Sequence, residues 1–294
     1  MRKAIALLLI LISACLGVWL GQQRFRMPEF AGPTLHIAFI DVPGGESALI
    51  QTPDGRSALV DAGRADDGPA VVTFLRRHGV TRLDLLLLTR RHPDHIGGVP
   101  YLLESVPVDH VVDCGCSYSS EPEQRALREI FARRIPYKTA RAGQVFHLGN
   151  PGAATSAAIS VLLPEKPLTG TAALANNKSV VTRVSFGGVS ALLLSDIGPE
   201  EEARLIASDA DLSCDVVKVS GNASSKCTSN ELLRLTKPAY AVITVKPRTA
   251  AHKRFDREIA PRMEASGVSM ARTDEYGAVI VATDGRHIRV SGER

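Results

Sequence analysis

Three side chains that can bind a metal ion lie close together in the stretch TRRHPDHIGG: His92, Asp94 and His95. Zinc binds imidazole nitrogens and carboxylate oxygens, and a catalytic zinc keeps one position open for water. The bound water is acidified to a pKa of about 7 and becomes a nucleophile. These residue types point to a metal site that could support hydrolysis, and Asp94 is the candidate catalytic residue. Arg90 and Arg91 stand where further ligands are expected, which raises the question of whether metal still binds.

The elements that must position this motif can be predicted from the pattern around it. An apolar run, residues 83–88, is typical of a strand covered on both faces, and a helix is expected after the Gly97–Gly98 turn. Further strands are predicted over residues 35–41, 47–52, 56–63, 157–163, 179–186, 189–195, 215–220, 239–245, 277–283 and 286–291, and helices over 66–79, 120–134, 198–207, 228–235 and 256–267. Ser120 with Glu123, and Thr228 with Glu231, have capping-box spacing. Two packed sheets with helices on their outer faces suit this order, so we predict an α/β fold, a four-layer αββα sandwich.

The N-terminal segment differs from the rest of the chain. After a basic start, the run AIALLLILISACLGVWL is uncharged, which is typical of a secretory signal or a membrane anchor. We therefore expect residues 1–21 to be a signal or membrane-anchor segment, 22–33 a polar tether, and 34–294 the folded domain. ISAC, which ends at Cys15, also resembles a lipoprotein processing site. The expected location is the extracytoplasmic face of the cell envelope, as an anchored, lipid-modified or secreted protein.

The composition is that of an ordinary globular protein. The chain has 294 residues, of which 45% are hydrophobic and 22% charged, and its net charge of +4 is mild. Aromatic residues make up only 5%, and the basic residues are dispersed. A nonspecific nucleic-acid module is therefore not indicated, because it needs stacking surfaces and massed positive charge.

Several separate motifs occur in an order that resembles one family. They are DVPGGES (41–47), DAG (61–63), TRRHPDHIGG (89–98), NNKSVV (176–181), Ser195-Asp196, VKVSGNASSKCTS (217–229) and RTDEYGAVIVATDG (272–285). Their order and spacing resemble the metallo-β-lactamase superfamily and, more narrowly, the extracytoplasmic domain of the ComEC-type competence proteins. The resemblance covers most of the chain. It implies the metallo-β-lactamase fold and the activity class of a metal-dependent phosphoesterase or nuclease.

The resemblance also implies which ligands remain and which are lost. The remaining metal positions are His92, Asp94, His95 and Asp196. Arg90 falls on the first histidine of the family motif, Gly221 and Asn222 fall on its His-His pair, and only His252 matches a later His-Pro-His. A guanidinium cannot lose its proton to bind a metal. The resemblance therefore implies at most one ion, zinc or manganese, with no ion as the alternative.

Each retained residue also has a purely structural interpretation. His92 is then a polar residue at a strand end. Asp94 caps the helix that follows Gly97, and Asp196 caps a helix that begins near Pro199.

Two further hypotheses follow from the lost ligands. Arg90, Arg91 and Arg254 would replace the charge of the metal and hold a phosphate or carboxylate without hydrolysing it, unless Arg91 is simply a solvated surface residue. The family places the loops of Cys116 and Cys227 near the site, and a disulfide between them would lock a pocket that metal no longer organises. The alternative is that these cysteines are small buried hydrophobic residues.

Three functions stay open from the sequence. The first is a hydrolase-like envelope protein with an impaired or lost metal site, that is, a pseudoenzyme. The second is an active phosphodiesterase or nuclease that uses a single metal at Asp94, His95 and Asp196. The third is a non-catalytic anion-binding module. The expected partners are the membrane, through the N-terminal segment, and a phosphate-containing or nucleic-acid ligand; no protein partner is inferred.

Overall fold

The computed structural model describes residues 30, 32–116, 118–165, 179–220, 227–245 and 255–294. The chain divides into the units Met1–Gly32 and Pro33–Arg294, and every element named below lies in the second unit. None of the described helices combines the length and hydropathy needed to cross a bilayer. The predicted signal or anchor segment, residues 1–21, lies outside the described residues.

The elements of the first half are β1 (Leu35–Phe39), β2 (Ala48–Gln51), β3 (Ser57–Val60), the 3-10 turn η1 (Ala65–Asp67), α2 (Gly68–Arg77), β4 (Leu85–Leu88), α3 (Pro93–Ile96), α4 (Val99–Ser105), β5 (Val111–Asp113), α5 (Glu121–Ala132), β6 (Tyr137–Thr139) and β7 (Val145–Leu148). Those of the second half are β8 (Ala157–Leu163), β9 (Val181–Phe186), β10 (Val189–Leu193), α6 (Pro199–Ile206), β11 (Val216–Lys218), α7 (Asn230–Thr236), β12 (Tyr240–Ile243), the π-helical turn η3 (Phe255–Ile259), α9 (Ala260–Ala265), β13 (Ser269–Arg272), α10 (Thr273–Tyr276), β14 (Val279–Thr283) and β15 (Ile288–Gly292).

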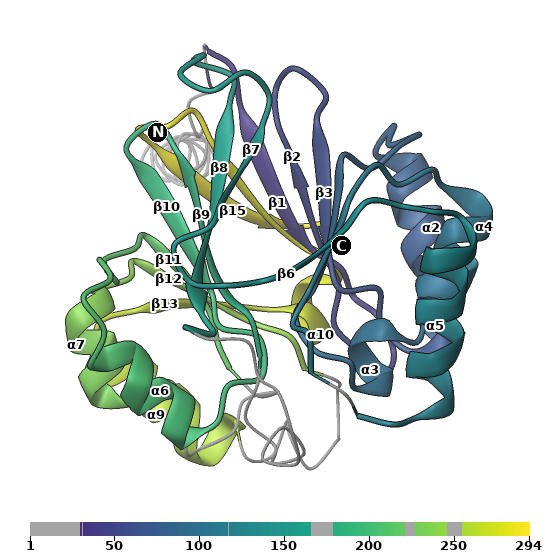
Figure 1. The fold of residues 1–294 in the computed structure, drawn as a ribbon. Helices are drawn as coiled ribbons and strands as arrows, with labels where there is room; N and C mark the ends of the chain where they lie inside the picture. Colours follow the sequence, from purple (N-terminus) through teal and green to yellow (C-terminus); the bar gives the residue numbers. More distant parts are fainter. Residues whose placement is uncertain (1–29, 31, 117, 166–178, 221–226, 246–254) are drawn as a thin grey trace, which may run out of the picture. The chain divides into compact units, whose positions relative to one another are not determined.

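The strands form two mixed sheets (Figure 1). The first has the order β15-β14-β1-β2-β3-β4-β5-β6, and the second has the order β13-β12-β11-β10-β9-β8-β7. Strands β3 to β6 pair in parallel in the first sheet, as do β10 to β13 in the second. Parallel neighbours require crossover connections. Because these strands run in the same direction, their carboxyl ends lie at one edge of each sheet, where the loops that carry the motifs begin.

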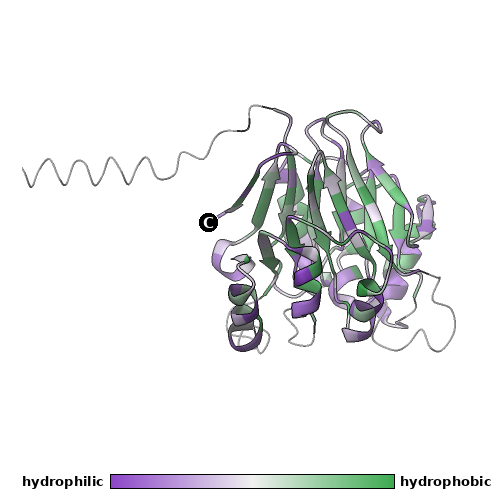
Figure 2. Ribbon diagram, turned by 90° about the vertical axis from the view of Figure 1, so that its left-hand side faces the viewer, coloured by the Kyte–Doolittle hydropathy of each residue, from purple (hydrophilic) through white to green (hydrophobic). Residues whose placement is uncertain are grey.

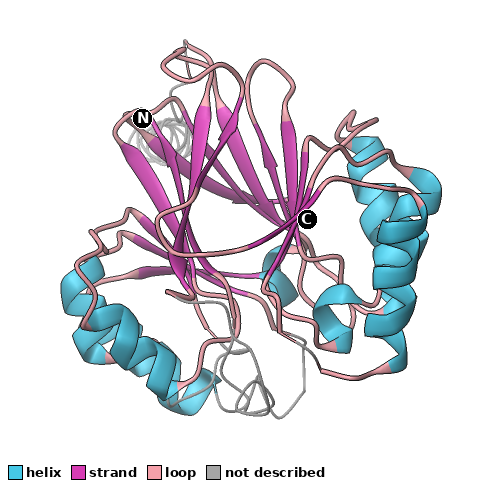
Figure 3. Ribbon diagram, in the orientation of Figure 1, coloured by secondary structure: helices cyan, strands magenta, loops and turns pink. Residues whose placement is uncertain are grey.

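Three apolar clusters separate four layers. The first cluster lies between the sheets and includes Phe39 from β1 and Ile159 from β8. The second joins the first sheet to α2, α4 and α5, for example through Phe74. The third joins the second sheet to α6, α7 and α9, for example through Leu205 and Met263. Figure 3 shows the helices outside both sheets, and Figure 2 shows apolar strands beside helices with hydrophilic outer faces. The predicted αββα sandwich is confirmed for this unit.

Most predicted elements are present with slightly different ends, including the helix after Gly98, which is α4. The strands β5, β6, β7 and β13 were not predicted, because three or four residues carry little periodic pattern. The predicted Ser120–Glu123 capping box is confirmed. The cap predicted at Thr228 is wrong. Ser229 caps α7 by accepting a hydrogen bond from the Leu232 N–H at 3.1 Å, whereas Thr228 accepts one from the Ser220 N–H.

Candidate functional site

The candidate site forms where strand ends of the two sheets meet. Asp61 follows β3, Thr89 follows β4, and Ser195 lies two residues after β10. The Thr89 N–H and hydroxyl donate to the two carboxylate oxygens of Asp61 at 2.8 and 2.6 Å, and the hydroxyls of Thr89 and Ser195 lie 2.6 Å apart. Asp61 and Ser195 both have left-handed backbone conformations, with φ of 59° and 51°. These buried contacts connect the two sheets directly beneath the motif.

A glycine at position 45 allows the loop after β1 to reach the same place. A Cβ atom at Gly45 would lie 2.1 Å from the carbonyl oxygen of Asp94, so only glycine fits. The next residue, Glu46, donates its N–H to that carbonyl at 3.0 Å and accepts from the Gly63 N–H at 2.9 Å. The loop thereby holds the Glu46 side chain against the turn that contains the metal motif.

His95 is the centre of the cluster and is fully buried. Its Nδ1 lies 2.8 Å from Asp61 Oδ2, and its Nε2 lies 3.1 Å from Asp196 Oδ2. Burial by itself would lower the pKa of His95, but the two carboxylates outweigh burial and raise the pKa well above its usual range. Each ring nitrogen of His95 therefore faces a carboxylate oxygen, an arrangement that favours the protonated imidazole.

Glu46 and Lys218 form a second buried pair. The Lys218 ammonium donates to Glu46 Oε1, and the Thr244 hydroxyl donates to the same oxygen at 3.2 Å. Both charged side chains are less than 8% exposed. Burial raises the pKa of Glu46, and the adjacent Lys218 offsets part of that rise. Lys218 is the last residue of β11 in the second sheet, so this pair also links the two sheets.

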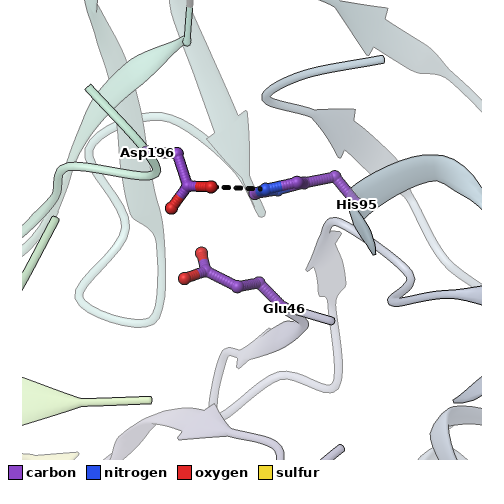
Figure 4. Close-up of side chains that lie close together, drawn as sticks. All are labelled: Glu46, His95 and Asp196. Carbon is purple, nitrogen blue, oxygen red and sulfur yellow. Dashed lines mark hydrogen bonds and ion pairs between the residues drawn. The ribbon is translucent and has the colours of Figure 1, made fainter. Parts of the chain in front are cut away.

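Glu46, His95 and Asp196 together have the composition of a metal-ligand set (Figure 4). Their ligand atoms all lie within 4.8 Å of one another. Ligand atoms at about 2.0–2.2 Å from one zinc ion lie at most about 4.4 Å apart, so a small contraction would bring them around a single ion. One glutamate, one histidine and one aspartate match a catalytic zinc site in the number of protein ligands, and each is a residue type that binds zinc.

The charges around these three residues oppose that use. A histidine ligand must be neutral, so His95 would have to release a proton. Asp196 already faces the Arg90 guanidinium, with Nη1 at 3.4 Å from Oδ2. Burial by itself would raise the pKa of Asp196, but the hydrogen bond from His95 and the charges of His95, Lys218 and Arg90 hold the pKa well below its usual range. The donor atoms therefore fit one ion, but Lys218 and Arg90 already balance the charges of Glu46 and Asp196, and the raised pKa of His95 opposes the loss of its proton.

The structure places the other two predicted ligands at the margin of this cluster. The His92 Nδ1 contacts Asp94 Oδ1, and the His92 ring lies edge-on to Tyr118 with a centroid separation of 4.6 Å. Asp94 Oδ1 is 3.7 Å from His95 Nε2. Asp94 lies inside α3 and Gly198 is the N-cap of α6, so neither Asp94 nor Asp196 has the capping role that was the structural alternative.

Arg91 points away from Asp196 into a separate network. Its guanidinium lies 2.7 Å from Asp113, 3.1 Å from Glu123 and 2.9 Å from the Tyr137 hydroxyl. The structure therefore does not bring Arg91 together with Arg90 around an open anion site. Arg91 is not a solvated surface residue either, because only 14% of its side chain is exposed. Two buried carboxylates already balance its charge.

The remaining predicted residues divide into two groups. Arg254, His252, Gly221 and Asn222 lie outside the described residues. The predicted disulfide is not formed in the structure, where Cys116 and Cys227 are both buried thiols. The Cys116 N–H donates to Cys114 Sγ at 3.4 Å, so Cys116 packs within its own turn. This agrees with the alternative of small buried side chains.

Sequence reasoning missed Glu46 and Lys218. Both lie in motifs that were recognised, DVPGGES and VKVSGNASSKCTS. The signal was the presence of one acidic and one basic residue beside strands that were expected to be buried on both faces. An isolated buried charge is costly, so two such residues of opposite sign predict a pair.

Comparison with known proteins supports a superfamily assignment. The profile of the metallo-beta-lactamase superfamily matches residues 41–135. The ComE operon protein 3 of Bacillus subtilis (strain 168) is 24% identical over 260 residues, which is 83% of this chain and 32% of that protein. The competence protein ComA of Neisseria gonorrhoeae is 26% identical over 284 residues, 93% of this chain and 37% of that protein. The chain thus spans about a third of the length of these two relatives.

Shorter and more distant similarities agree with the fold. A hydroxyacylglutathione hydrolase of Vibrio parahaemolyticus is 43% identical over 67 residues, 23% of this chain and 24% of that enzyme. Among solved structures, a protein assigned as a metal-dependent hydrolase from Parabacteroides distasonis matches with a TM-score of 0.51 and 16% identity, covering 83% of this chain and 94% of that one. A mutant of the CmlA β-hydroxylase matches with a TM-score of 0.52 and 14% identity, covering 84% and 53%. At these identities the structural matches show the fold alone.

Proposed function

We propose that this chain, which is a ComEC-type member of the metallo-β-lactamase superfamily, is a hydrolase-like domain whose metal centre is impaired or lost, with the Arg90 guanidinium where the superfamily motif has a metal-binding histidine. The observation that carries the proposal is the pairing of two candidate ligands with cations of the chain itself. Lys218 contacts Glu46, and Arg90 contacts Asp196. The third candidate ligand, His95, is protonated between two carboxylates.

The energetic argument concerns competition for the same negative charge. An arginine stays charged at every accessible pH. A divalent ion at Asp196 would therefore sit beside a fixed guanidinium and would also have to displace a proton from His95. The nearby guanidinium and the proton on His95 each reduce the affinity for metal. The histidines that the superfamily motif has at positions 90, 221 and 222 are absent from this chain, so they cannot compensate. We infer that the two-metal centre is lost and that metal binding is weak or absent.

A single-metal phosphodiesterase or nuclease is the second candidate function. One observation favours it. Asp196 Oδ1 is buried and has no hydrogen-bond partner among the described residues, which is unusual for a carboxylate oxygen unless it has a further ligand. A bound zinc or manganese ion would supply an acidified water as nucleophile. Glu46, His95 and Asp196 would hold it, and Asp94 would orient groups at the margin.

An anion-binding module has less support. Arg90 and Arg91 both have carboxylate partners, so a phosphate or nucleic-acid ligand would have to compete with these for either guanidinium. An envelope location, on the extracytoplasmic face and with the membrane as partner, is proposed from the apolar N-terminal run and from the similarity to competence proteins.

Metal analysis of the full-length chain tests the proposal. The protein is equilibrated with zinc or manganese, dialysed, and assayed for metal content and for hydrolysis of bis(p-nitrophenyl) phosphate. We expect much less than one ion per chain and no hydrolysis above background. The Arg90→His variant should bind more metal than the wild type, because it exchanges a guanidinium for an imidazole ligand.

Arg125→His is the matched control, because Arg125 is exposed on α5 and has no contact with the site. It should leave metal content unchanged. About one tight ion per wild-type chain, together with metal-dependent hydrolysis, would instead establish the single-metal enzyme.

A further inference from the structure

A cavity of about 690 Å³ lies at the end of the parallel strands that is opposite to the candidate site. Its lining includes Leu85, Val111 and Tyr137, which are the first residues of β4, β5 and β6. The candidate site lies beyond the last residues of such strands. The other wall is β7 of the second sheet. The cavity is therefore a separate feature, open where β6 and β7, the edge strands of their sheets, lie on the same side of the sandwich.

The floor of this cavity is apolar because it is the end of the core between the sheets. Leu85, Val112 and Leu148 belong to that core, and Phe146 packs against it. Val145 also lines the cavity and is 47% exposed. The residues of the lining come from strands and the loops next to them, with no described helix among them. Leu85, Val112 and Leu148 are themselves buried, so apolar surface reaches solvent mainly at Val145 and the half-buried Phe146. The concave surface has the size that binds drug-sized ligands, about 300–1,000 Å³.

The rim of the cavity has an excess of groups that bind anions. Its two acidic residues already have cationic partners: Asp84 is 2.8 Å from Arg56, and Asp109 is 2.7 Å from the Arg82 Nε. Three other rim residues can carry positive charge, and none of them forms an ion pair with another described residue. They are His110, Lys138 and His147, all exposed and placed on the two facing walls.

We propose that this cavity binds a single-chain amphiphile with an anionic headgroup, of the fatty-acid class. The acyl chain lies along Val145 and Phe146, above the buried Leu85 and Leu148, and burying its methylene groups supplies the affinity. The headgroup lies at the rim, where Lys138 contributes a charge-assisted hydrogen bond. Charge complementarity selects this occupant, since a cationic amphiphile would face Lys138 while the rim carboxylates are held by arginines.

Calorimetric titration of the full-length chain with decanoate, below its micelle concentration, tests the proposal. Decyltrimethylammonium has the same chain with the opposite charge and serves as the ligand control. We expect saturable binding of decanoate at one site and none of decyltrimethylammonium. Lys138→Glu should weaken decanoate binding about tenfold or more, because a charged hydrogen bond is replaced by repulsion. Arg125→Glu makes the same charge change on an exposed face outside the cavity and should leave the affinity unchanged.

Three results would overturn the proposal: equal binding of the two amphiphiles, equal loss of affinity in the two variants, or a dimer in sedimentation that excludes decanoate from this face. The last result would make a second copy of the chain the occupant. Val145→Asp provides an independent check, because it places a negative charge at the exposed part of the lining and should also weaken binding. None of these outcomes depends on metal content, so the proposal and the proposed function fail separately.

Discussion

Arg90 and Arg91 are neighbours in the chain but differ in the number of their carboxylate partners and in the distances to them. Arg91 contacts Asp113, Glu123 and Tyr137 at distances between 2.7 and 3.1 Å. Arg90 contacts Asp196 at 3.4 Å through a single nitrogen. Both side chains are largely buried, at 14% and 17% exposure. Burial therefore does not distinguish the two arginines, whereas the number of their partners and the distances to them do.

Arg91 therefore stabilises the fold, whereas Arg90 is part of the candidate site. Arg91 holds together the loop after β4, the end of β5, the start of α5 and β6. Among the described residues, no other cationic side chain forms an ion pair with Asp113 or Glu123. Asp196 has a second cationic partner in His95 at 3.1 Å. Removing Arg91 would leave two buried carboxylates unbalanced, whereas removing Arg90 leaves Asp196 paired with His95.

The largest effect is expected for Arg91→Met. Breaking a buried ion pair by removing one partner costs about 3–5 kcal/mol, because the remaining charge stays buried. Asp113 is fully buried and Glu123 nearly so. The free energy of unfolding, measured by urea titration at neutral pH, should fall by this amount. A loss below 1 kcal/mol would show that water reaches Asp113 and that the network is not structural.

Tyr137→Phe, which removes one neutral partner, should cost about 1 kcal/mol.

A somewhat smaller effect is expected for Lys218→Met, which leaves Glu46 without its cation. Burial already raises the pKa of Glu46, so the variant can accept a proton there instead of burying a bare charge. The cost then approaches that of an unsatisfied buried polar group, about 1–3 kcal/mol. Because the folded pKa of Glu46 rises further in the variant, the loss of stability should be small at low pH and should grow as the pH rises.

Urea titrations of Lys218→Met at several pH values between 4 and 8 measure this dependence. Lys138→Met is the matched control, because Lys138 is exposed and forms no ion pair with a described residue. A loss that is independent of pH would contradict the raised pKa of Glu46.

The same contrast explains how far sequence reasoning went. The strands and helices, the αββα layers and the convergence of His95 with Asp196 follow from apolar periodicity and from a motif order that resembles a known family. The partners of Arg90 and Arg91 do not follow, because adjacent residues after a strand end point in different directions that depend on the following turn. Glu46 escaped notice for a similar reason: its position depends on the close approach of Gly45 to the Asp94 carbonyl, a contact 49 residues apart in the chain.

A third prediction concerns the pH dependence of the whole site without metal. The folded pKa of His95 is raised, so its stabilising contribution is present below its unfolded pKa of about 6.5 and is lost as the pH rises through the folded value. The folded pKa of Asp196 is lowered, so its contribution is present above about pH 4 and is lost as the pH falls. Stability should therefore be greatest between these limits. In His95→Gln, urea titrations should show no decline that begins above pH 6.5; an unchanged decline would place the titrating group elsewhere.

The smallest effect is expected for Arg90→Met, the direct counterpart of the first substitution. Its single contact is long, and Asp196 keeps the hydrogen bond from His95, so the free energy of unfolding should change by no more than about 1 kcal/mol. The informative result is the difference between the two variants in one urea series, which should reach several-fold in favour of Arg91. If Arg90→Met destabilised the protein as strongly as Arg91→Met, the guanidinium at position 90 would be a structural replacement for the metal rather than a local countercharge. The Arg90→His variant would then fail to gain metal because the domain needs the guanidinium in order to fold.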